Sequence, residues 1–136
     1  MTVGASYILI ADDDPDDVDT FRDAFIQKFP GMSVIDVSNG EELIAYLEGI
    51  STLPVIVLMD YKMPILTAAE ILTKLNANDR YAGIIKLVWS TSDLRQYVDE
   101  CRRAGAEHYF AKPNTGSELA VILQNIEVVL EQRSIA

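Results

Sequence analysis

Five short apolar segments alternate with longer segments of helical periodicity along this 136-residue chain. The apolar segments span residues 7–11, 34–37, 55–59, 84–89 and 109–111. The third is almost continuously apolar, which is typical of a strand whose two faces are both covered in a parallel sheet. The regular alternation of strand and helix therefore predicts a parallel sheet with helices on both of its faces.

The helices are predicted from apolar residues that recur at three- and four-residue spacing. Asp14 can cap the first helix and Pro15 suits its first position, while Pro30 and Gly31 end it. The residues that mark the five helices are Val18, Phe21, Phe25 and Phe29; Leu43, Ile44 and Leu47; Ala68, Leu72 and Leu75; Leu94, Val98 and Cys101; and Leu119, Ile122, Ile126 and Val129.

We predict an α/β fold, a doubly wound five-stranded parallel sheet of flavodoxin-like strand order 2-1-3-4-5 with five helices. This order places strands 1 and 3 side by side at the switch point, where ligands bind at the carboxyl ends of the strands. We expect one domain over residues 1–136, with its core at about residues 7–130. The last helix ends close to Ala136, so no output domain is expected.

Composition narrows the class of protein. The chain is 49% hydrophobic and 24% charged, which is ordinary for a soluble globular domain, and its net charge of -10 argues against nonspecific binding to nucleic acid. The single cysteine, Cys101, excludes an internal disulfide and suits a reducing cytosol. We find no signal peptide and no apolar run near the ~20 residues that a membrane span needs. We therefore expect a cytoplasmic protein without nucleic-acid or membrane partners.

Polar residues stand where four of the predicted strands end. Asp12 and Asp13 follow the first strand, Asp60 the third, Ser90 the fourth and Lys112 the fifth. Because the carboxyl ends of parallel strands meet at one edge, the three carboxylates would repel one another by roughly a few kcal/mol per pair at an effective dielectric constant of about 20. Such a cluster binds protons at raised pKa or recruits a cation. Without a convergent His or Cys, these oxygens favour Mg²⁺ or Mn²⁺ over zinc.

The same edge suits a phosphoryl group. Mg²⁺ commonly shares a phosphate oxygen, and Lys112 can neutralise another oxygen or form a salt bridge with Asp60. Ser90 or Thr91 offers a hydroxyl to a third oxygen. Asp60 is the candidate nucleophile, which would form an aspartyl phosphate. Catalysis there would consist mainly of positioning and charge neutralisation.

The chain resembles the response-regulator receiver domain, the CheY-like module of two-component signalling. The segments that carry the resemblance are Ile8–Asp13, Val55–Pro64, Leu87–Ser92 and Ala104–Pro113. The resemblance implies a stand-alone single-domain regulator that takes a phosphoryl group from a histidine kinase or phosphotransfer protein. It also implies Mg²⁺ dependence and output by conformational change and protein contact. Enzymatic activity would be limited to its own phosphorylation and dephosphorylation.

The resemblance assigns the metal and the phosphoryl group to four residues. Asp60 corresponds to the phosphoacceptor and is also a metal ligand. Asp12 and Asp13 correspond to the metal-binding acids, with Asp13 the direct ligand, and the backbone carbonyl of Lys62 completes the protein ligands. The side chain of Lys62, two residues beyond the phosphoacceptor, is expected to modulate phosphoryl lifetime, either by screening the aspartyl phosphate from water or by pairing with a partner's acid.

The resemblance assigns the switch to the fourth and fifth strands. Ser90 corresponds to the hydroxyl that turns toward the phosphoryl group, and Tyr109 corresponds to the aromatic switch residue. Lys112 corresponds to the site lysine, and its bond to Pro113 is a candidate cis peptide. Ser92 is expected to modulate the site together with Lys62.

One departure from the family pattern lies after Met63-Pro64, where Thr67-Ala68 replaces the usual Asp-Gly pair. Thr67 can still cap a helix, whereas Ala68 forgoes the freedom of glycine at positive φ. We therefore expect this loop to follow a different path from the loop usual in the family.

Other charged and aromatic residues near the strand ends have structural interpretations. Asp14, Asp16, Asp17 and Asp19 favour the dipole of the first helix. Trp89 is assigned to core or edge packing and is a candidate fluorescence reporter.

The output surface has two interpretations. Arg95, Arg102 and Arg103 form either a solvated face with i,i+4 pairs to Asp99 or part of a partner surface made by helix 4, strand 5 and helix 5. The chain is expected to be a monomer or a phosphorylation-linked homodimer. The segment Asp12–Asp17 resembles single-domain regulators that partner phytochrome-like or hybrid kinases.

Two rival functions stay open. A small phosphohydrolase of the haloacid-dehalogenase type would use a nucleophile on strand 1, which the Asp12-x-Asp14 spacing permits. Against it, residues 90–93 are Ser-Thr-Ser-Asp where such enzymes carry a second acidic pair. A pseudo-receiver that is never phosphorylated is the other rival, and the intact acids and lysine argue against it.

Overall fold

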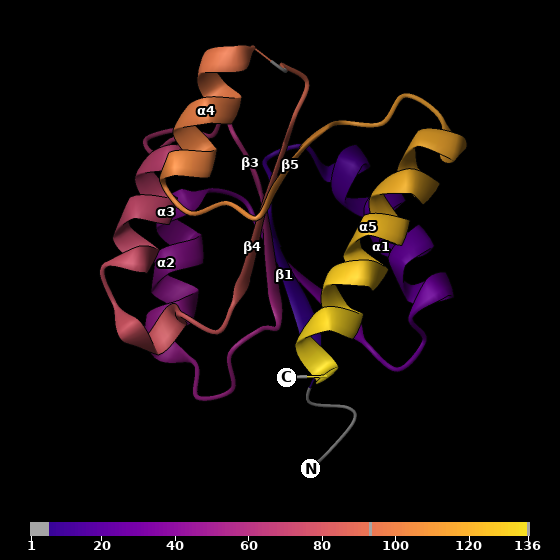
Figure 1. Ribbon diagram of the computed structural model, residues 1–136, viewed down its shortest axis with the longest axis horizontal. Helices are drawn as coiled ribbons and strands as arrows, with labels where there is room; N and C mark the ends of the chain where they lie inside the picture. The colour runs from indigo at the N-terminus through magenta and orange to yellow at the C-terminus, as the bar shows by residue number, and fades with distance from the viewer. Residues whose placement is uncertain (1–5, 93, 136) are drawn as a thin grey trace.

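A central parallel sheet with helices on both faces organises the computed structural model, which describes residues 6–92 and 94–135 (Figure 1). Residues 1–5, 93 and 136, which the predicted domain range includes, lie outside the described residues. The strands are β1 (Tyr7–Ala11), β2 (Ser33–Val37), β3 (Ile56–Asp60), β4 (Ile85–Ser90) and β5 (His108–Ala111). Their order is β2-β1-β3-β4-β5 and every pairing is parallel, so the predicted fold class and topology are confirmed.

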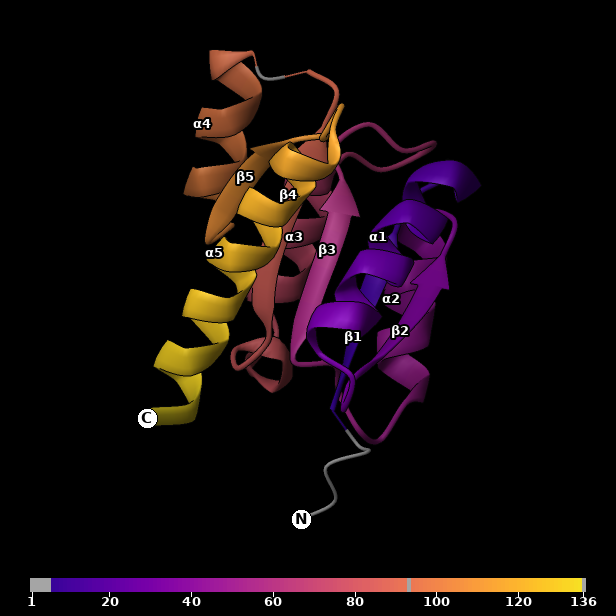
Figure 2. The same ribbon diagram turned by 90° about the vertical axis from the view of Figure 1, so that its right-hand side faces the viewer.

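The helices cover the sheet in two groups. They are α1 (Pro15–Lys28), α2 (Gly40–Gly49), α3 (Ala68–Asn76), α4 (Arg95–Arg103) and α5 (Gly116–Ile135), with a 3₁₀ turn, η2, at Asp79–Tyr81. Figure 1 shows α2, α3 and α4 on one side of the sheet, and Figure 2 shows α1 and α5 in front of the other face. In the part of the chain that the structure describes, no helix is long and apolar enough to cross a membrane.

Side-chain caps start the helices where the sequence predicts them. Asp14 Oδ1 accepts the backbone N–H of Asp16 at 2.9 Å, and Pro15 follows as the first residue of α1. Thr67 and Glu70 form a reciprocal capping box at the start of α3, with Thr67 N–H donating to Glu70 Oε1 at 2.9 Å. These caps end the loops that leave the carboxyl edge of the sheet.

Two apolar clusters cover the two faces of the sheet. Along β3, Val57 and Met59 belong to the cluster shared with α2 and α3, while Ile56 and Leu58 belong to the cluster shared with α1 and α5. This two-sided burial explains the continuous apolar run of β3. It also holds the carboxyl ends of β1, β3 and β4 rigidly at one edge, where their terminal polar residues meet.

The loop between β3 and α3 contains one strained residue. Ile65 has φ of +79°, the only positive φ at a non-glycine position among residues 6–92 and 94–135, and its side chain is 73% exposed. A β-branched residue in this region is a conformational outlier, costing about 1–2 kcal/mol. Ala68, by contrast, is the first residue of α3 and is buried. Ile65, rather than Ala68, is therefore the residue of this loop that has a positive φ.

Candidate functional site

The three aspartates predicted from the strand ends meet at the carboxyl edge. Asp12, Asp13 and Asp60 each offer a carboxylate oxygen, and these oxygens all lie within 4.8 Å of one another. Asp12 and Asp60 are buried, at 4% and 7% exposure, whereas Asp13 is exposed. The register that pairs β1 with β3 places the first and third strand ends side by side. The cluster thus combines two buried acids with one that is open to solvent.

The ammonium of Lys112 lies among three carboxylates. Its Nζ is 2.8 Å from Asp17 Oδ2, 2.9 Å from Asp12 Oδ2 and 3.1 Å from Asp60 Oδ2. Desolvation lowers the pKa of Lys112, but hydrogen bonds to Asp17 and Asp12 and the charge of Asp60 outweigh that effect and raise it above its usual value. Lys112 is therefore a fixed positive charge at the centre of the site, and the expected salt bridge with Asp60 is present.

The carboxyl group of Asp60 is held in a partly unfavourable environment. Desolvation raises its pKa, Lys112 lowers it, and Asp12 raises it, with a net rise above the usual value. Asp60 Oδ1 also accepts the backbone N–H of Lys62 at 3.3 Å. Ionised Asp60 therefore favours the arrival of further positive charge.

Both carboxylate oxygens of Asp12 accept hydrogen bonds. Its Oδ1 accepts the backbone N–H of Asp14 at 2.9 Å, and its Oδ2 accepts Trp89 Nε1–H at 2.9 Å in addition to Lys112. The sequence predicts packing for Trp89, with use as a fluorescence reporter, and a helix-dipole role for Asp17, and it predicts no contact of either residue with the site. The first turn of α1 carries several acids, and their pattern does not distinguish the one that reaches Lys112.

Ser90 and Tyr109 converge on the backbone of Ser92. Ser90 is buried and its Oγ accepts the N–H of Ser92 at 3.1 Å. The hydroxyl of Tyr109 donates to the carbonyl of Ser92 at 2.6 Å. The candidate switch residues are thus connected through the segment between β4 and α4, and Ser92, predicted to modulate the site, lies between them.

Comparison with known proteins identifies the family. The model of the response regulator receiver domain matches residues 8–124. The chain belongs to this family. Two-component response regulator ORR5 of Oryza sativa subsp. japonica is 25% identical over 123 residues, covering 90% of this chain and 90% of its own.

Solved structures share the fold of this receiver domain. The phosphorylated cyanobacterial phytochrome response regulator RcpA has a TM-score of 0.80 at 23% identity, covering 89% of this chain and 90% of that chain. The receiver domain of sensor histidine kinase PA1611 from Pseudomonas aeruginosa PAO1, solved with a magnesium ion in its active-site cleft, has a TM-score of 0.69 at 24% identity. It covers 88% of this chain and 94% of that chain.

One expectation for this receiver domain is wrong. The Lys112–Pro113 bond, a candidate cis peptide, is trans. An X–Pro bond prefers trans by roughly 0.5–1 kcal/mol, and the trans chain already places Lys112 among its carboxylates.

Residues beside the phosphoacceptor candidate contact α4. Lys62 is exposed, and its Nζ lies 5.3 Å from the ring centroid of Tyr97. Tyr61 is buried, stacks on Tyr97 at 4.4 Å between centroids, and donates its hydroxyl to Glu100 Oε1 at 3.1 Å. Sequence reasoning gave Tyr61 no role. Tyr61, which directly follows Asp60, therefore contacts α4, the helix that the family resemblance assigns to output.

The expected ion pairs on α4 are not formed. Neither Arg95–Asp99 nor Asp99–Arg103 lies within salt-bridge distance among the described residues. Exposed i,i+4 pairs are worth only about 0.3–0.5 kcal/mol, too little to hold long side chains in one geometry.

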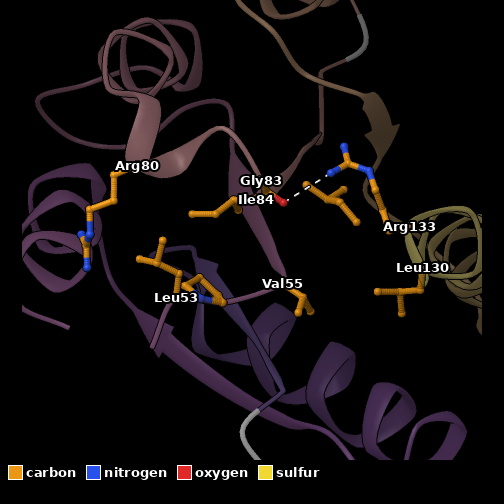
Figure 3. A pocket seen from close by; sticks show the side chains of 9 residues that line it. Leu53, Val55, Arg80, Gly83, Ile84, Leu130 and Arg133 are labelled. Carbon is orange, nitrogen blue, oxygen red and sulfur yellow. Dashed lines mark hydrogen bonds between the residues drawn. The ribbon is translucent and has the colours of Figure 1, made fainter. Parts of the chain in front are cut away.

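A hollow of about 450 Å³ lies at the opposite, amino-terminal edge of the sheet (Figure 3). It is lined by Leu53, Pro54, Val55, Arg80, Gly83, Ile84, Ile85, Leu130 and Arg133. Arg80 donates to the carbonyl of Leu47 at 2.6 Å, and Arg133 donates to the carbonyl of Gly83 at 3.3 Å. The lining holds no carboxylate or other nucleophile, so the acid cluster is the candidate functional site.

Proposed function

We propose that this receiver domain is a phosphoacceptor of two-component signalling, in which Asp60 accepts a phosphoryl group from a histidine kinase or phosphotransfer protein. The observation that carries this proposal is the convergence of Asp12, Asp13 and Asp60 within 4.8 Å, with Lys112 Nζ in contact with Asp12 and Asp60. Membership of the response regulator receiver family supports the general role.

The donor set fits Mg²⁺. It consists of hard carboxylate oxygens, and the exposed Asp13 has room for a hydrated ion. Asp12, Asp13, Asp60 and the backbone carbonyl of Lys62 would hold the metal, and of Asp12 and Asp13 the exposed Asp13 would be the direct ligand. When bound, the metal would supply positive charge to the oxygens of the transferring phosphoryl group.

The chain's own residues perform the transfer by position and charge. A carboxylate oxygen of Asp60 forms a bond to phosphorus while the bond between phosphorus and the donor nitrogen breaks. Lys112 then neutralises charge on the new acyl phosphate, because its ammonium already lies 3.1 Å from Asp60 Oδ2. Such a group undergoes one transfer per signal and makes the protein a switch rather than a turnover enzyme.

Output follows two routes toward the surface of α4, β5 and α5. Ser90 and Tyr109 act through the backbone of Ser92, as their hydrogen bonds support. Tyr61, adjacent to Asp60, acts through its stack on Tyr97. The exposed arginines of α4, which form no ion pairs among the described residues, suit an acidic surface on a protein target. Charge on Asp60 would shift a pre-existing equilibrium between two positions of this surface.

The test is phosphorylation by acetyl phosphate with Mg²⁺, followed by intact-protein mass spectrometry. We expect a mass gain of one phosphoryl group in the wild type, no gain in Asp60→Asn, and a slower gain in Asp13→Asn. Asp23→Asn, an exposed acid of α1, is the matched control and should behave as wild type. Absence of both a mass shift and Mg²⁺ affinity in the wild type would contradict the proposal.

The phosphohydrolase rival is disfavoured by the environment of Asp12. Both of its oxygens accept hydrogen bonds, and its side chain has no exposed surface. It would have to break these contacts to attack a substrate. Steady hydrolysis of a phosphomonoester that survives Asp60→Asn but is lost in Asp12→Asn would restore the rival.

A further inference from the structure

The indole of Trp89 contacts Asp12 and Lys112 of the candidate site from within the core. Trp89 is 1% exposed and lies on β4 immediately before Ser90. Its Nε1–H donates to Asp12 Oδ2 at 2.9 Å, and Lys112 Nζ lies 5.4 Å from its ring centroid. A residue that only packed the core would make neither contact.

The N–H of Trp89 differs from the other donors to Asp12. Asp14 is two residues away on the same loop, so its N–H can follow a movement of Asp12. Lys112 is shared with two other carboxylates. Trp89 is attached to β4, on the far side of β3 from β1, and its ring is packed edge-on against Phe21 at 5.6 Å between centroids. The indole is therefore the anchored donor that orients the Asp12 carboxylate.

The face of the same ring serves Lys112. An aromatic face attracts a cation electrostatically, and the attraction is stronger where the cation is desolvated, as the 9% exposed side chain of Lys112 is. The ring is thus a further favourable contact for the ammonium, beside the carboxylate of Asp12 that both side chains contact. Trp89 therefore contacts Asp12 through its indole N–H and the Lys112 ammonium through its ring.

We propose that Trp89 is a positioning residue of the phosphorylation site, which orients Asp12 through its indole N–H and Lys112 through its ring. The proposal rests on the proposed function, because its effect is exerted on Mg²⁺ binding and phosphoryl transfer. Outer-sphere partners that orient metal-site ligands typically change metal affinity by 10–100-fold. Trp89 is the hydrogen-bond partner of this kind for Asp12.

Two substitutions separate the two actions. Trp89→Phe keeps an aromatic face but removes the N–H, so Mg²⁺ affinity measured by calorimetry should fall by roughly tenfold. Phosphorylation by acetyl phosphate should slow at limiting Mg²⁺ and return to near the wild-type rate at saturating Mg²⁺. Trp89→Leu removes the ring as well, so its phosphorylation rate should stay low even at saturating Mg²⁺.

Phe25→Leu is the matched control. Phe25 is fully buried in the same apolar cluster and stacks on Phe21, without contact to Asp12 or Lys112. It should lose stability as the Trp89 variants do and keep the wild-type Mg²⁺ affinity. A general weakening of the core would instead lower Mg²⁺ affinity in all three variants and would overturn the positioning role.

A spectroscopic measurement on the unmodified protein does not depend on the folding of any variant. The chain has one tryptophan, so a ¹H–¹⁵N spectrum contains one indole resonance. We expect it to shift during a Mg²⁺ titration with the dissociation constant found by calorimetry. An unshifted indole, or Trp89→Phe with wild-type Mg²⁺ affinity, overturns the inference and leaves the proposed function standing. A wild type that neither binds Mg²⁺ nor is phosphorylated overturns both.

Discussion

At the carboxyl edge of the sheet Lys112 lies among three carboxylates, whereas at the amino edge Arg80 and Arg133 donate to the backbone carbonyls of Leu47 and Gly83. Arg80 belongs to η2, and its guanidinium reaches the C-terminal end of α2, where a cation complements the helix dipole and the last carbonyls. The carboxyl edge instead concentrates like charges around one cation. Charge at the amino edge stabilises the fold, while at the carboxyl edge desolvation, with a smaller contribution from Asp12, raises the pKa of Asp60 even though Lys112 lowers it.

Lys112→Met would produce the largest effect in this comparison. Removing the cation leaves buried acids unpaired, so the free energy of unfolding should fall by about 2–4 kcal/mol at pH 7 and phosphorylation should be lost. Mg²⁺ should restore part of the stability, because a metal cation can take over the neutralisation. Urea denaturation with and without Mg²⁺ measures both effects.

Arg133→Met is the counterpart at the amino edge. The pair of Arg133 with Glu107 is partly exposed, so its loss should cost less than about 1 kcal/mol and leave phosphorylation unchanged. Equal losses of stability in the two variants would remove the distinction between the edges.

Asp60→Asn should make the protein more stable than the wild type at neutral pH, and it should abolish phosphorylation. The folded-state pKa of Asp60 is raised, so the stability that its protonated form contributes is complete below its usual pKa of 3.8 and is lost as pH rises through the raised value. The melting temperature of Asp60→Asn should therefore match wild type at low pH and exceed it by a few degrees at neutral pH.

Saturating Mg²⁺ should narrow this difference by stabilising the ionised wild type. Thermal melts across pH, with Asp23→Asn as the exposed control, provide the measurement. A wild type more stable than Asp60→Asn at neutral pH without Mg²⁺ would show that the acid cluster is not strained.

Ile65→Asn tests the backbone strain at the carboxyl edge. Asparagine adopts positive φ more readily than a β-branched residue, and little burial is lost because Ile65 is exposed, so unfolding should cost about 1 kcal/mol more. Ile65→Val retains the branched side chain and should leave stability near wild type. Guanidinium denaturation of the three proteins decides between strain and a surface effect.

Tyr61→Phe should lower the free energy of unfolding by only about 0.5–1.5 kcal/mol, from the lost hydrogen bond to Glu100, because the stack on Tyr97 remains. Phosphorylation at Asp60 should proceed at the wild-type rate. The amide shifts that phosphorylation causes in α4 should shrink relative to wild type in NMR spectra. Unchanged α4 shifts would leave Ser90 and Tyr109 as the only proposed route of output.

Much of the acid cluster was predictable because its members end strands. Asp12, Asp13, Asp60 and Lys112 follow apolar runs, and parallel pairing brings such positions together. Asp17 was missed because it lies among several acids of one helical turn, each equally suited to a helix dipole. Tyr61 was missed because its partners, Tyr97 and Glu100, are remote in sequence and belong to a helix whose orientation no local pattern specifies.

The local pattern of apolar residues, caps and strand-terminal acids was sufficient to predict the fold, the strand order and the members of the acid cluster. Each of these depends on short-range periodicity and on the general rules of parallel sheets. The contacts that orient the cluster depend instead on packing across three strands. The sequence predicts that Trp89 packs in the core, and the residue is buried there. Whether its N–H donates to Asp12 or to solvent depends on the strand register and on the rotamer of the indole. These are properties of the assembled sheet, because they depend on side chains that are 77 residues apart.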